Sequence, residues 1–278
     1  MTILKFQKKI LSWRTKNRRN MPWRKTSDPY KILVSEVMLQ QTQVSRVVPK
    51  YREFLKEFPT LKAVAETSNA NLLRVWRGLG YWRRARFLKA TAQTILKKYK
   101  GVFPKEPEVL ERLPGIGRYT ARALACFAFN NPETFIDTNI RRVYLHFFFP
   151  NRKNVSDKEI LKIAQKCLYS ISHGRRKESI TAREWHYALF DYGAMALKDK
   201  AINKRSRHYA KQSRFEGSFR SFRTSIMRFL LDQPKQKATT NKIKRMLRKG
   251  GSPYPSEKLL VSLEKDDLIK KQGVSYSL

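Results

Sequence analysis

Apolar side chains recur every three or four positions along most of this chain, the spacing that gathers them on one face of a helix. Glycine, proline and short polar runs separate these segments and predict the turns between them. No alternation typical of strands occurs before about residue 215, so the pattern predicts a mostly α protein. The helices predicted in this part span residues 3–13, 30–42, 44–58, 60–65, 69–76, 83–99, 121–129, 140–148, 157–172 and 180–197.

The pattern changes after residue 197. Residues 198–214 are polar and basic, and they predict a linker or a phosphate-contacting segment. Residues 215–278 predict a separate small α+β domain, in which three helices followed by a hairpin give the order of a winged helix. A basic cap that touches only protein is the alternative interpretation. The elements predicted in this domain are helices at 219–231, 239–248 and 255–264 and a hairpin around Gln272-Gly273.

The stretch from 109 to 129 carries the most specific local signal. Pro114 ends a short helix, and two glycines then bracket Ile116. Glycine permits backbone conformations that a β-carbon forbids and lets two backbones approach closely. We therefore expect a helix-hairpin-helix in which Ile116 fills the gap and the first N–H groups of the second helix face a phosphate. An ordinary turn between two helices is the alternative.

The net charge of the chain indicates what kind of molecule it binds. The chain has 60 Lys and Arg against 22 Asp and Glu, a formal net charge of +38, and a polyanion is the simplest partner for such an excess, although a membrane-surface protein could also be this basic. No apolar run reaches the roughly 18–20 residues needed to span a bilayer, so no membrane partner is expected. The cations that the C-terminal domain offers to DNA phosphates are Lys242, Lys244, Arg245, Arg248 and Lys249.

The cysteines predict no metal site. Cys126 and Cys167 lie in apolar helical patterns without metal-ligand spacing, so we expect buried thiols in a reducing compartment. The N-terminal residues lack the apolar core and cleavage site of a signal peptide. Together these features predict a cytoplasmic, nucleoid-associated protein.

Two carboxyl groups are candidates for acid–base chemistry. Glu36 interrupts an apolar helix, where a carboxyl is costly to bury unless it is protonated or hydrogen-bonded. Asp137 follows the apolar run at 134–136. A raised pKa would make one group a general acid, while the other, kept ionised, would stabilise a cationic sugar. Two structural roles compete with this hypothesis: Glu36 as an ion-paired helix residue, and Asp137 as the N-cap of the helix starting near Asn139.

Several motifs between residues 5 and 197 carry a family resemblance. The chain resembles the helix-hairpin-helix DNA glycosylases of the endonuclease III superfamily, and within them the adenine-removing MutY branch. The string SEVMLQQTQV at 35–44 is the most specific of these motifs. The others are Pro22-Trp23-Arg24, Phe58-Pro59-Thr60, Gly78-Leu79-Gly80-Tyr81 with Arg84-Ala85-Arg86, Leu113 to Thr120, and Asp137-Thr138-Asn139.

The resemblance implies roles for the candidate catalytic residues. Glu36 matches the glutamate that protonates the flipped adenine, and Asp137 matches the aspartate that stabilises the oxocarbenium-like sugar. Asn139 matches a residue that supports this aspartate. Tyr119 stands where bifunctional relatives carry a Schiff-base lysine, which implies a monofunctional enzyme without strong lyase activity.

The resemblance also implies contacts with DNA. Gln41 and Tyr81 match residues that wedge into the stack around the base opposite the adenine, since a flipped nucleotide leaves a hole to fill. Arg24 matches an arginine beside the pocket. The remaining expected DNA-binding residues are Leu79, Gly115, Ile116, Gly117, Arg118 and Thr120.

Two departures from the family bear on cofactors and on specificity. Relatives carry four cysteines after the segment that matches 191–194, and these ligate a [4Fe–4S] cluster. The corresponding stretch here has no cysteine, so we expect no cluster. MutY enzymes also append a Nudix-like domain that reads 8-oxoguanine. Residues 215–278 are too short for it, so recognition of that base is less well supported than removal of adenine.

The expected fold is a two-lobed helical glycosylase. Residues 1–20 and 131–197 are expected to form one lobe and residues 21–130 a six-helix barrel lobe, followed by the linker and the winged-helix-like domain. The expected function is removal of adenine mispaired with guanine or 8-oxoguanine in double-stranded DNA, by a monomer. A thymine or uracil glycosylase acting on G mismatches, and a non-catalytic mismatch- or DNA-binding protein, are the alternatives.

Overall fold

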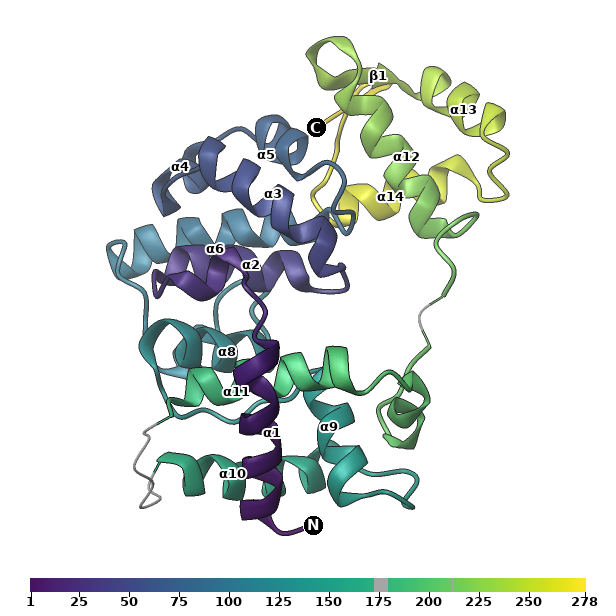
Figure 1. Ribbon diagram of the computed structural model, residues 1–278. Coiled ribbons are helices and arrows are strands. Elements are labelled where there is room, and N and C mark those ends of the chain that lie inside the picture. Colours follow the sequence, from purple (N-terminus) through teal and green to yellow (C-terminus); the bar gives the residue numbers. More distant parts are fainter. Residues whose placement is uncertain (173–179, 212) are drawn as a thin grey trace. The chain divides into compact units, whose positions relative to one another are not determined.

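The computed structural model describes residues 1–172, 180–211 and 213–278, which divide into two compact units (Figure 1). Unit 1 comprises Met1–Glu36, Pro104–Arg112 and Ile116–Lys211. Unit 2 comprises Val37–Phe103, Leu113–Gly115 and Gln212–Leu278. The mostly helical class predicted from the sequence is confirmed. Among the described residues, no helix combines the length and apolarity needed to cross a bilayer.

Unit 1 is built around aromatic side chains. The ring of Phe6 lies 5.0–5.7 Å, centroid to centroid, from four other rings, among them Tyr144 and Trp185. These contacts join the first helix to α9 and α11. The elements of unit 1 are α1 (Ile3–Asn17), η1 (Pro22–Lys25), most of α2 (Pro29–Leu39), α7 (Pro107–Leu110), α8 (Arg118–Phe129), α9 (Thr138–Phe148), α10 (Asp157–Ser172), α11 (Ala182–Asp191), η2 (Tyr192–Ala196) and η3 (Lys200–Arg205).

The helix predicted at 180–197 has a more detailed structure. Thr181 caps it in a capping box with Glu184, α11 ends at Asp191, and η2 continues as a wider π-helical turn. Gly193 lies in this turn, where an added β-carbon would lie 2.3 Å from the carbonyl oxygen of Asn139. Glycine therefore permits the close approach of η2 to the start of α9.

The helical part of unit 2 consists of α3 (Val44–Glu57), α4 (Leu61–Glu66), α5 (Asn69–Trp76) and α6 (Arg83–Tyr99), with α4 against α6 and α3 against α5. Arg84 of α6 is buried, and its Nη1 donates to the carbonyl oxygens of Val37, Met38 and Gln40 at 2.6–2.9 Å. These last carbonyls of α2 have no partner within their own helix, so Arg84 caps the end of α2.

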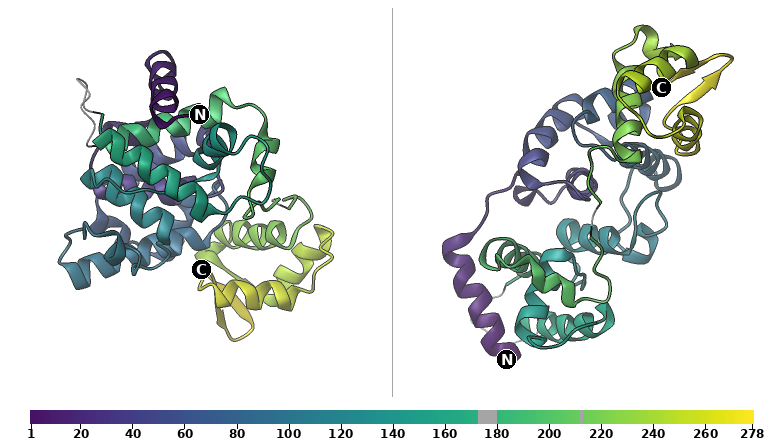
Figure 2. Two further views of the ribbon diagram at one scale, coloured as in Figure 1. Left: turned by 90° about the horizontal axis from the view of Figure 1, so that it is seen from below. Right: turned by 90° about the vertical axis from the view of Figure 1, so that its right-hand side faces the viewer.

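Residues 215–278 form the predicted winged helix. Its elements are α12 (Phe219–Leu231), η4 (Pro234–Gln236), β1 (Lys237–Thr239), α13 (Thr240–Lys249), α14 (Ser256–Lys265), β2 (Lys270–Gln272) and β3 (Ser275–Ser277). The three antiparallel strands have the order β1-β3-β2, with Tyr276 opposite both Ala238 and Lys271. The hairpin is visible in yellow in the right-hand view of Figure 2. β1 was not predicted, because three residues are too few for alternation to register.

The units differ from the expected domain boundaries in three stretches, because residues 21–36, 104–112 and 116–130 were assigned to the barrel lobe but belong to unit 1. In the last of these, Phe127 of α8 stacks on Tyr187 of α11 with ring centroids 4.7 Å apart. The winged helix groups with 37–103 rather than standing apart. Residues 173–179 of the predicted lobe lie outside the described residues.

The expected basic linker is partly folded. η3 lies within it, and Val155 pairs with this segment through hydrogen bonds to Arg205 and from Arg207, both 2.9 Å long. Residues 200–207 therefore belong to unit 1 as structure, because their backbone groups are satisfied there. Position 212 of the linker lies outside the described residues.

Candidate active site

Glu36 reaches the interior of unit 1 because α2 is apolar on both sides of it. Asp28 starts this helix, and its Oδ1 accepts hydrogen bonds from the N–H groups of Tyr30 and Lys31 at 2.9 and 3.3 Å. The buried residues of α2 that precede Glu36 include Leu33 and Val34. Glu36 is itself only 7% exposed, so its carboxyl has lost most of its water.

Burial sets the acidity of Glu36. Desolvation raises its pKa from 4.5 to about 7, and the charge of Asp137 acts in the same direction. The Tyr119 hydroxyl, which donates a hydrogen bond to Glu36, and the charge of Arg24 oppose this rise. The structure therefore brings Glu36, Tyr119 and Asp137 into one electrostatic group, and a group with a pKa near neutrality can give up a proton at physiological pH.

Asp137 is the N-cap of α9, as one of the two open interpretations predicted. Its Oδ1 accepts from the backbone N–H of Ile140 at 2.7 Å, and its Oδ2 accepts from the Asn139 side-chain amide at 3.0 Å. Burial raises the pKa of Asp137, and the hydrogen bonds from Ile140 and Asn139 oppose this rise. Capping fixes the carboxylate near Glu36, whose pKa its charge raises.

Arg24 forms part of the wall of this site and is not a free surface cation. Its two Nη atoms bind both carboxylate oxygens of Asp191 at 2.7 and 2.9 Å, and Arg19 binds the same carboxylate. Burial of Asp191 opposes its ionisation, but the two arginines outweigh it and lower its pKa. The guanidinium of Arg24 also lies 4.4 Å from the ring centroid of Tyr187.

Sequence reasoning missed several residues on α11. Tyr187 has its pKa raised to about 12 by burial, so its hydroxyl stays protonated. His186 stacks on Phe135 at 4.0 Å, and burial lowers its pKa to about 4, so it is neutral. Phe135 in turn meets the ring of Tyr119 edge-on at 5.6 Å. Each of these contacts joins positions far apart in sequence, and only the helical spacing on α11 indicated that this face is buried.

Arg142 is a further residue in this group. It lies on the second turn of α9, is 5% exposed, and donates from Nη1 to the carbonyl oxygen of Gly193 at 2.7 Å. The start of α9, with Asp137 as its cap, is thereby held to η2. The sequence shows the pair Arg141-Arg142 after Asn139, but it does not indicate which of the two side chains is buried.

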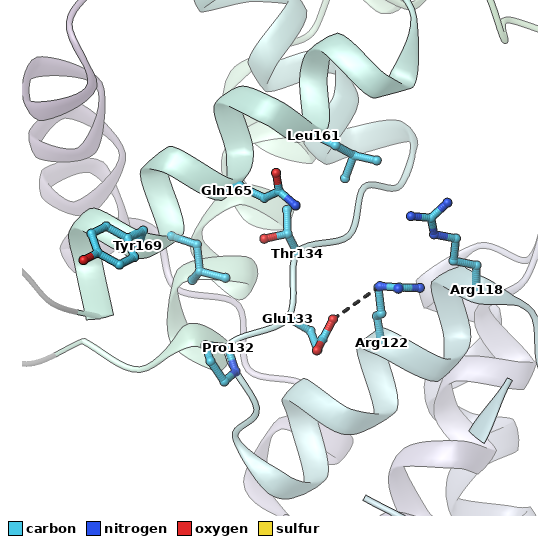
Figure 3. Close-up of a pocket in the computed structure, with 9 residues that line it drawn as sticks. Arg118, Arg122, Pro132, Glu133, Thr134, Leu161, Gln165 and Tyr169 are labelled. Carbon is cyan, nitrogen blue, oxygen red and sulfur yellow. Dashed lines mark ion pairs between the residues drawn. The ribbon is translucent and has the colours of Figure 1, made fainter. Parts of the chain in front are cut away.

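The residues expected to contact DNA from unit 1 have different environments. Arg118 and Gly117 are exposed at the start of α8, whereas Ile116 and Thr120 are buried, so any contact from these two would come from their backbone. Arg118 lines a cavity of about 380 Å³ together with Arg122 and Glu133, which form an ion pair (Figure 3).

Those in unit 2 also differ from one another. Gln41 is exposed and Tyr81 half-buried, and both have positive φ, 55° and 45°. Leu79 is 2% exposed and packs inside. Gly115, at φ 72°, has Phe87 so close that an added β-carbon would lie 2.5 Å from it. Glycine is therefore required at position 115, as the hairpin interpretation predicted.

The cysteines do not fit the iron–sulfur cluster that the resemblance implies for relatives. A [4Fe–4S] cluster takes four thiolates, and the chain has two cysteines. Both are buried thiols, Cys126 on α8 and Cys167 on α10, and burial raises the pKa of Cys167 to about 12. Within the described ranges, no group of three His, Cys, Asp or Glu side chains is arranged to hold a metal ion.

Comparison with known proteins agrees with this architecture. Residues 34–169 match the HhH-GPD superfamily base excision DNA repair proteins. The adenine DNA glycosylase of Buchnera aphidicola subsp. Baizongia pistaciae is 37% identical over 196 residues, which are 70% of this chain and 54% of that protein. The adenine DNA glycosylase of Mycolicibacterium smegmatis is 47% identical over 135 residues, 48% of this chain and 46% of that protein.

A solved structure is similar to this chain over most of its own length. The structure of a thermostable thymine-DNA glycosylase is similar with a TM-score of 0.60 and 25% identity, covering 73% of this chain and 92% of that one. The chain spans about half the length of the curated relatives above. The fold, the order of its motifs and these similarities identify residues 34–169 as a domain of the HhH-GPD superfamily, and the chain as a relative of the adenine DNA glycosylases.

Proposed function

We propose that the protein is a monofunctional adenine-DNA glycosylase that removes adenine mispaired with guanine or 8-oxoguanine, acting as a monomer on nucleoid DNA. The observation that carries this proposal is a buried glutamate with a pKa near 7 in one electrostatic group with a capped aspartate. The similarity to curated adenine DNA glycosylases supports the choice of base. The formal charge of +38 supports DNA as the partner.

The geometry supports a dissociative mechanism. Glu36 donates its proton to a ring nitrogen of the flipped adenine, and the C1′–N9 bond breaks with its electron pair leaving on the base. Positive charge develops on the sugar, and Asp137, fixed by Ile140 and Asn139, stabilises it. Water then adds at C1′, its released proton returns to the Glu36 carboxylate, and an abasic site remains.

Tyr119 bears on the fate of the DNA strand after base release. Its pKa is raised well above 10, first by burial and then by the charges of Glu36 and Asp137, so the hydroxyl stays neutral and donates to Glu36. A phenol cannot form the Schiff base that a lysine forms at C1′. The strand should therefore stay intact until alkali cleaves it.

A second candidate is a thymine or uracil glycosylase for G mismatches, which the similarity to a thymine-DNA glycosylase favours. Uracil or thymine can leave as a delocalised anion without protonation of a ring nitrogen, so a Glu36→Gln variant of such an enzyme would retain much of its activity. For adenine release, the same substitution removes the proton donor.

The test uses four strand-labelled duplexes containing A:8-oxoG, A:G, T:G or U:G, each with and without alkali after a single turnover. Alkali-dependent cutting at A is expected, and Asp137→Asn should abolish it while leaving duplex binding intact. Asp267→Asn, an exposed carboxylate in the winged helix, is the matched control. Cutting only at T or U would establish the second candidate, and binding without cutting would indicate a non-catalytic protein.

A further inference from the structure

The winged helix carries an uncompensated basic face on α13. Ile243 and Leu247 are buried on the inner side of this helix. Lys244, which was grouped with the other cations from the sequence, pairs instead with Glu257 of α14 at 2.7 Å. Within the described part of the chain, no ion pair engages the four cations exposed on the other side, which are Lys242, Arg245, Arg248 and Lys249.

These four side chains share one stripe of the helix. Successive residues of an α-helix are about 100° apart around the axis, so positions 242, 245, 248 and 249 fall within an arc of about 120°. Ile243 and Leu247 fall on the opposite side, which explains why one face packs and the other remains in water. The stripe is thus a row of positive charge that an extended anion can follow.

The next helix, α14, lacks this character. In a helix-turn-helix the second helix is the one that reads base edges in the major groove, and here that helix is α14. Its formal charge is zero, because Glu257 and Glu264 offset Lys258 and Lys265. The large apolar side chain of Val261 is 59% exposed on it. Arg, Asn and Gln make bidentate contacts to base edges, and α14 contains none of these three residues.

Ionic contacts tie the winged helix to the helical part of unit 2. Arg77 of the α5–α6 turn binds both oxygens of Asp232 at 2.7 and 3.1 Å. Asp266 receives both Arg83 of α6 and Arg223 of α12. Arg220 of α12 donates to the Tyr81 hydroxyl. The α13 stripe is therefore carried on the same compact unit as Tyr81 and Gln41.

We propose that the α13 stripe is a phosphate-binding surface that clamps duplex DNA without reading its sequence, and that α14 does not enter the groove. Lysine and arginine without carboxylate partners neutralise phosphates and release counterions, whereas a neutral helix gains nothing from the backbone. The inference rests on DNA being the partner, as proposed above, but not on adenine being the base removed.

The test compares two full-length variants that each remove four charges. The first replaces Lys242, Arg245, Arg248 and Lys249 with glutamine. The matched control replaces the four exposed lysines of α14 and β2, namely Lys258, Lys265, Lys270 and Lys271. Binding to two undamaged duplexes of unrelated sequence is measured by fluorescence anisotropy from 50 to 200 mM salt.

The α13 variant should flatten the slope of log K against log salt by up to about 3.6, since each phosphate contact contributes about 0.9. Between 50 and 200 mM salt, the affinity of the wild type should therefore fall about a hundredfold more than the affinity of the α13 variant. The control variant should keep most of the wild-type slope on both duplexes. An equal or larger change in the control, or no change in the α13 variant, would overturn the proposal.

Base excision from the A:8-oxoG duplex under saturating enzyme provides a separate readout. The α13 variant should need a higher enzyme concentration to reach its maximal single-turnover rate, because it has lost phosphate contacts. If wild-type protein binds duplex with the expected slope but releases no base, the proposed function fails while the α13 proposal stands. If base is released but the α13 variant keeps the wild-type slope, only the α13 proposal fails.

Discussion

Replacing Glu36 with glutamine should stop base release and, above pH 7, stabilise unit 1. The pKa of Glu36 is raised from 4.5 to about 7 in the folded protein. Between these values the folded state binds a proton that the unfolded chain does not, so wild-type stability falls as pH rises through this window. Glutamine has a similar shape and carries no charge, so the free energy of unfolding of the variant should not fall with pH in this way.

The size of the effect follows from linkage. A pKa raised from 4.5 to about 7 corresponds to about 3 kcal/mol at full ionisation. The stability difference between variant and wild type should grow from about 1 kcal/mol at pH 5 to about 3 kcal/mol at pH 8. The pH-dependent part of the difference isolates the carboxyl, because any fixed loss or gain from the amide cancels between the two pH values.

Native-state hydrogen exchange at α8 and α9 is the suitable assay, since it reports the opening of unit 1 even if the two units unfold separately. Glu53→Gln is the control for removal of a carboxyl from a side chain that is 52% exposed, and it should give a smaller difference at pH 8 than Glu36→Gln. A Glu36→Gln difference that is constant from pH 5 to 8, or that shrinks, would refute the reasoning.

Three further outcomes are expected. The single-turnover rate of adenine release should fall about tenfold per pH unit above about 7, as Glu36 loses its proton, and a flat profile to pH 9 would contradict an acid role. Asp191→Ala should lower unfolding free energy by about 3–5 kcal/mol in urea titrations, because Arg24 is left buried without its partner; a loss under about 1 kcal/mol would contradict that pairing. Gly193→Ala should destabilise by about 1–3 kcal/mol and slow base release, whereas Gly250→Ala, which has room for a β-carbon, should do neither.

The helices and the order of the winged helix could be predicted because apolar spacing is a local signal. The burial of Glu36 was predictable for the same reason, since apolar residues flank it within one helix. Asp137 is instructive, because capping and sugar stabilisation were weighed as alternatives. One oxygen of the carboxylate meets the helix N-terminus while the other meets Asn139, so the two roles do not compete.

The partners of charged residues were not predictable. Arg24 is distant in sequence from Asp191, and Arg220 from Tyr81, and periodicity indicates that a face is covered without indicating what covers it. The π-helical turn at 192–196 was missed because its residues continue the apolar spacing of α11. The ion pair of Arg77 with Asp232, which links the winged helix to residues 37–103, joins two exposed side chains and leaves no trace in hydrophobic patterning.

The contact between Gly193 and the start of α9 has a consequence for how this protein can change. The carbonyl of Asn139 occupies the space where any other residue at 193 would place its β-carbon. Arg142 closes the same contact from the other side by binding the Gly193 carbonyl. The start of α9 and the turn after α11 can thus vary only together. A recombinant that inherits Asp137 from one parent and the 192–196 turn from another should work only where both parents share this glycine.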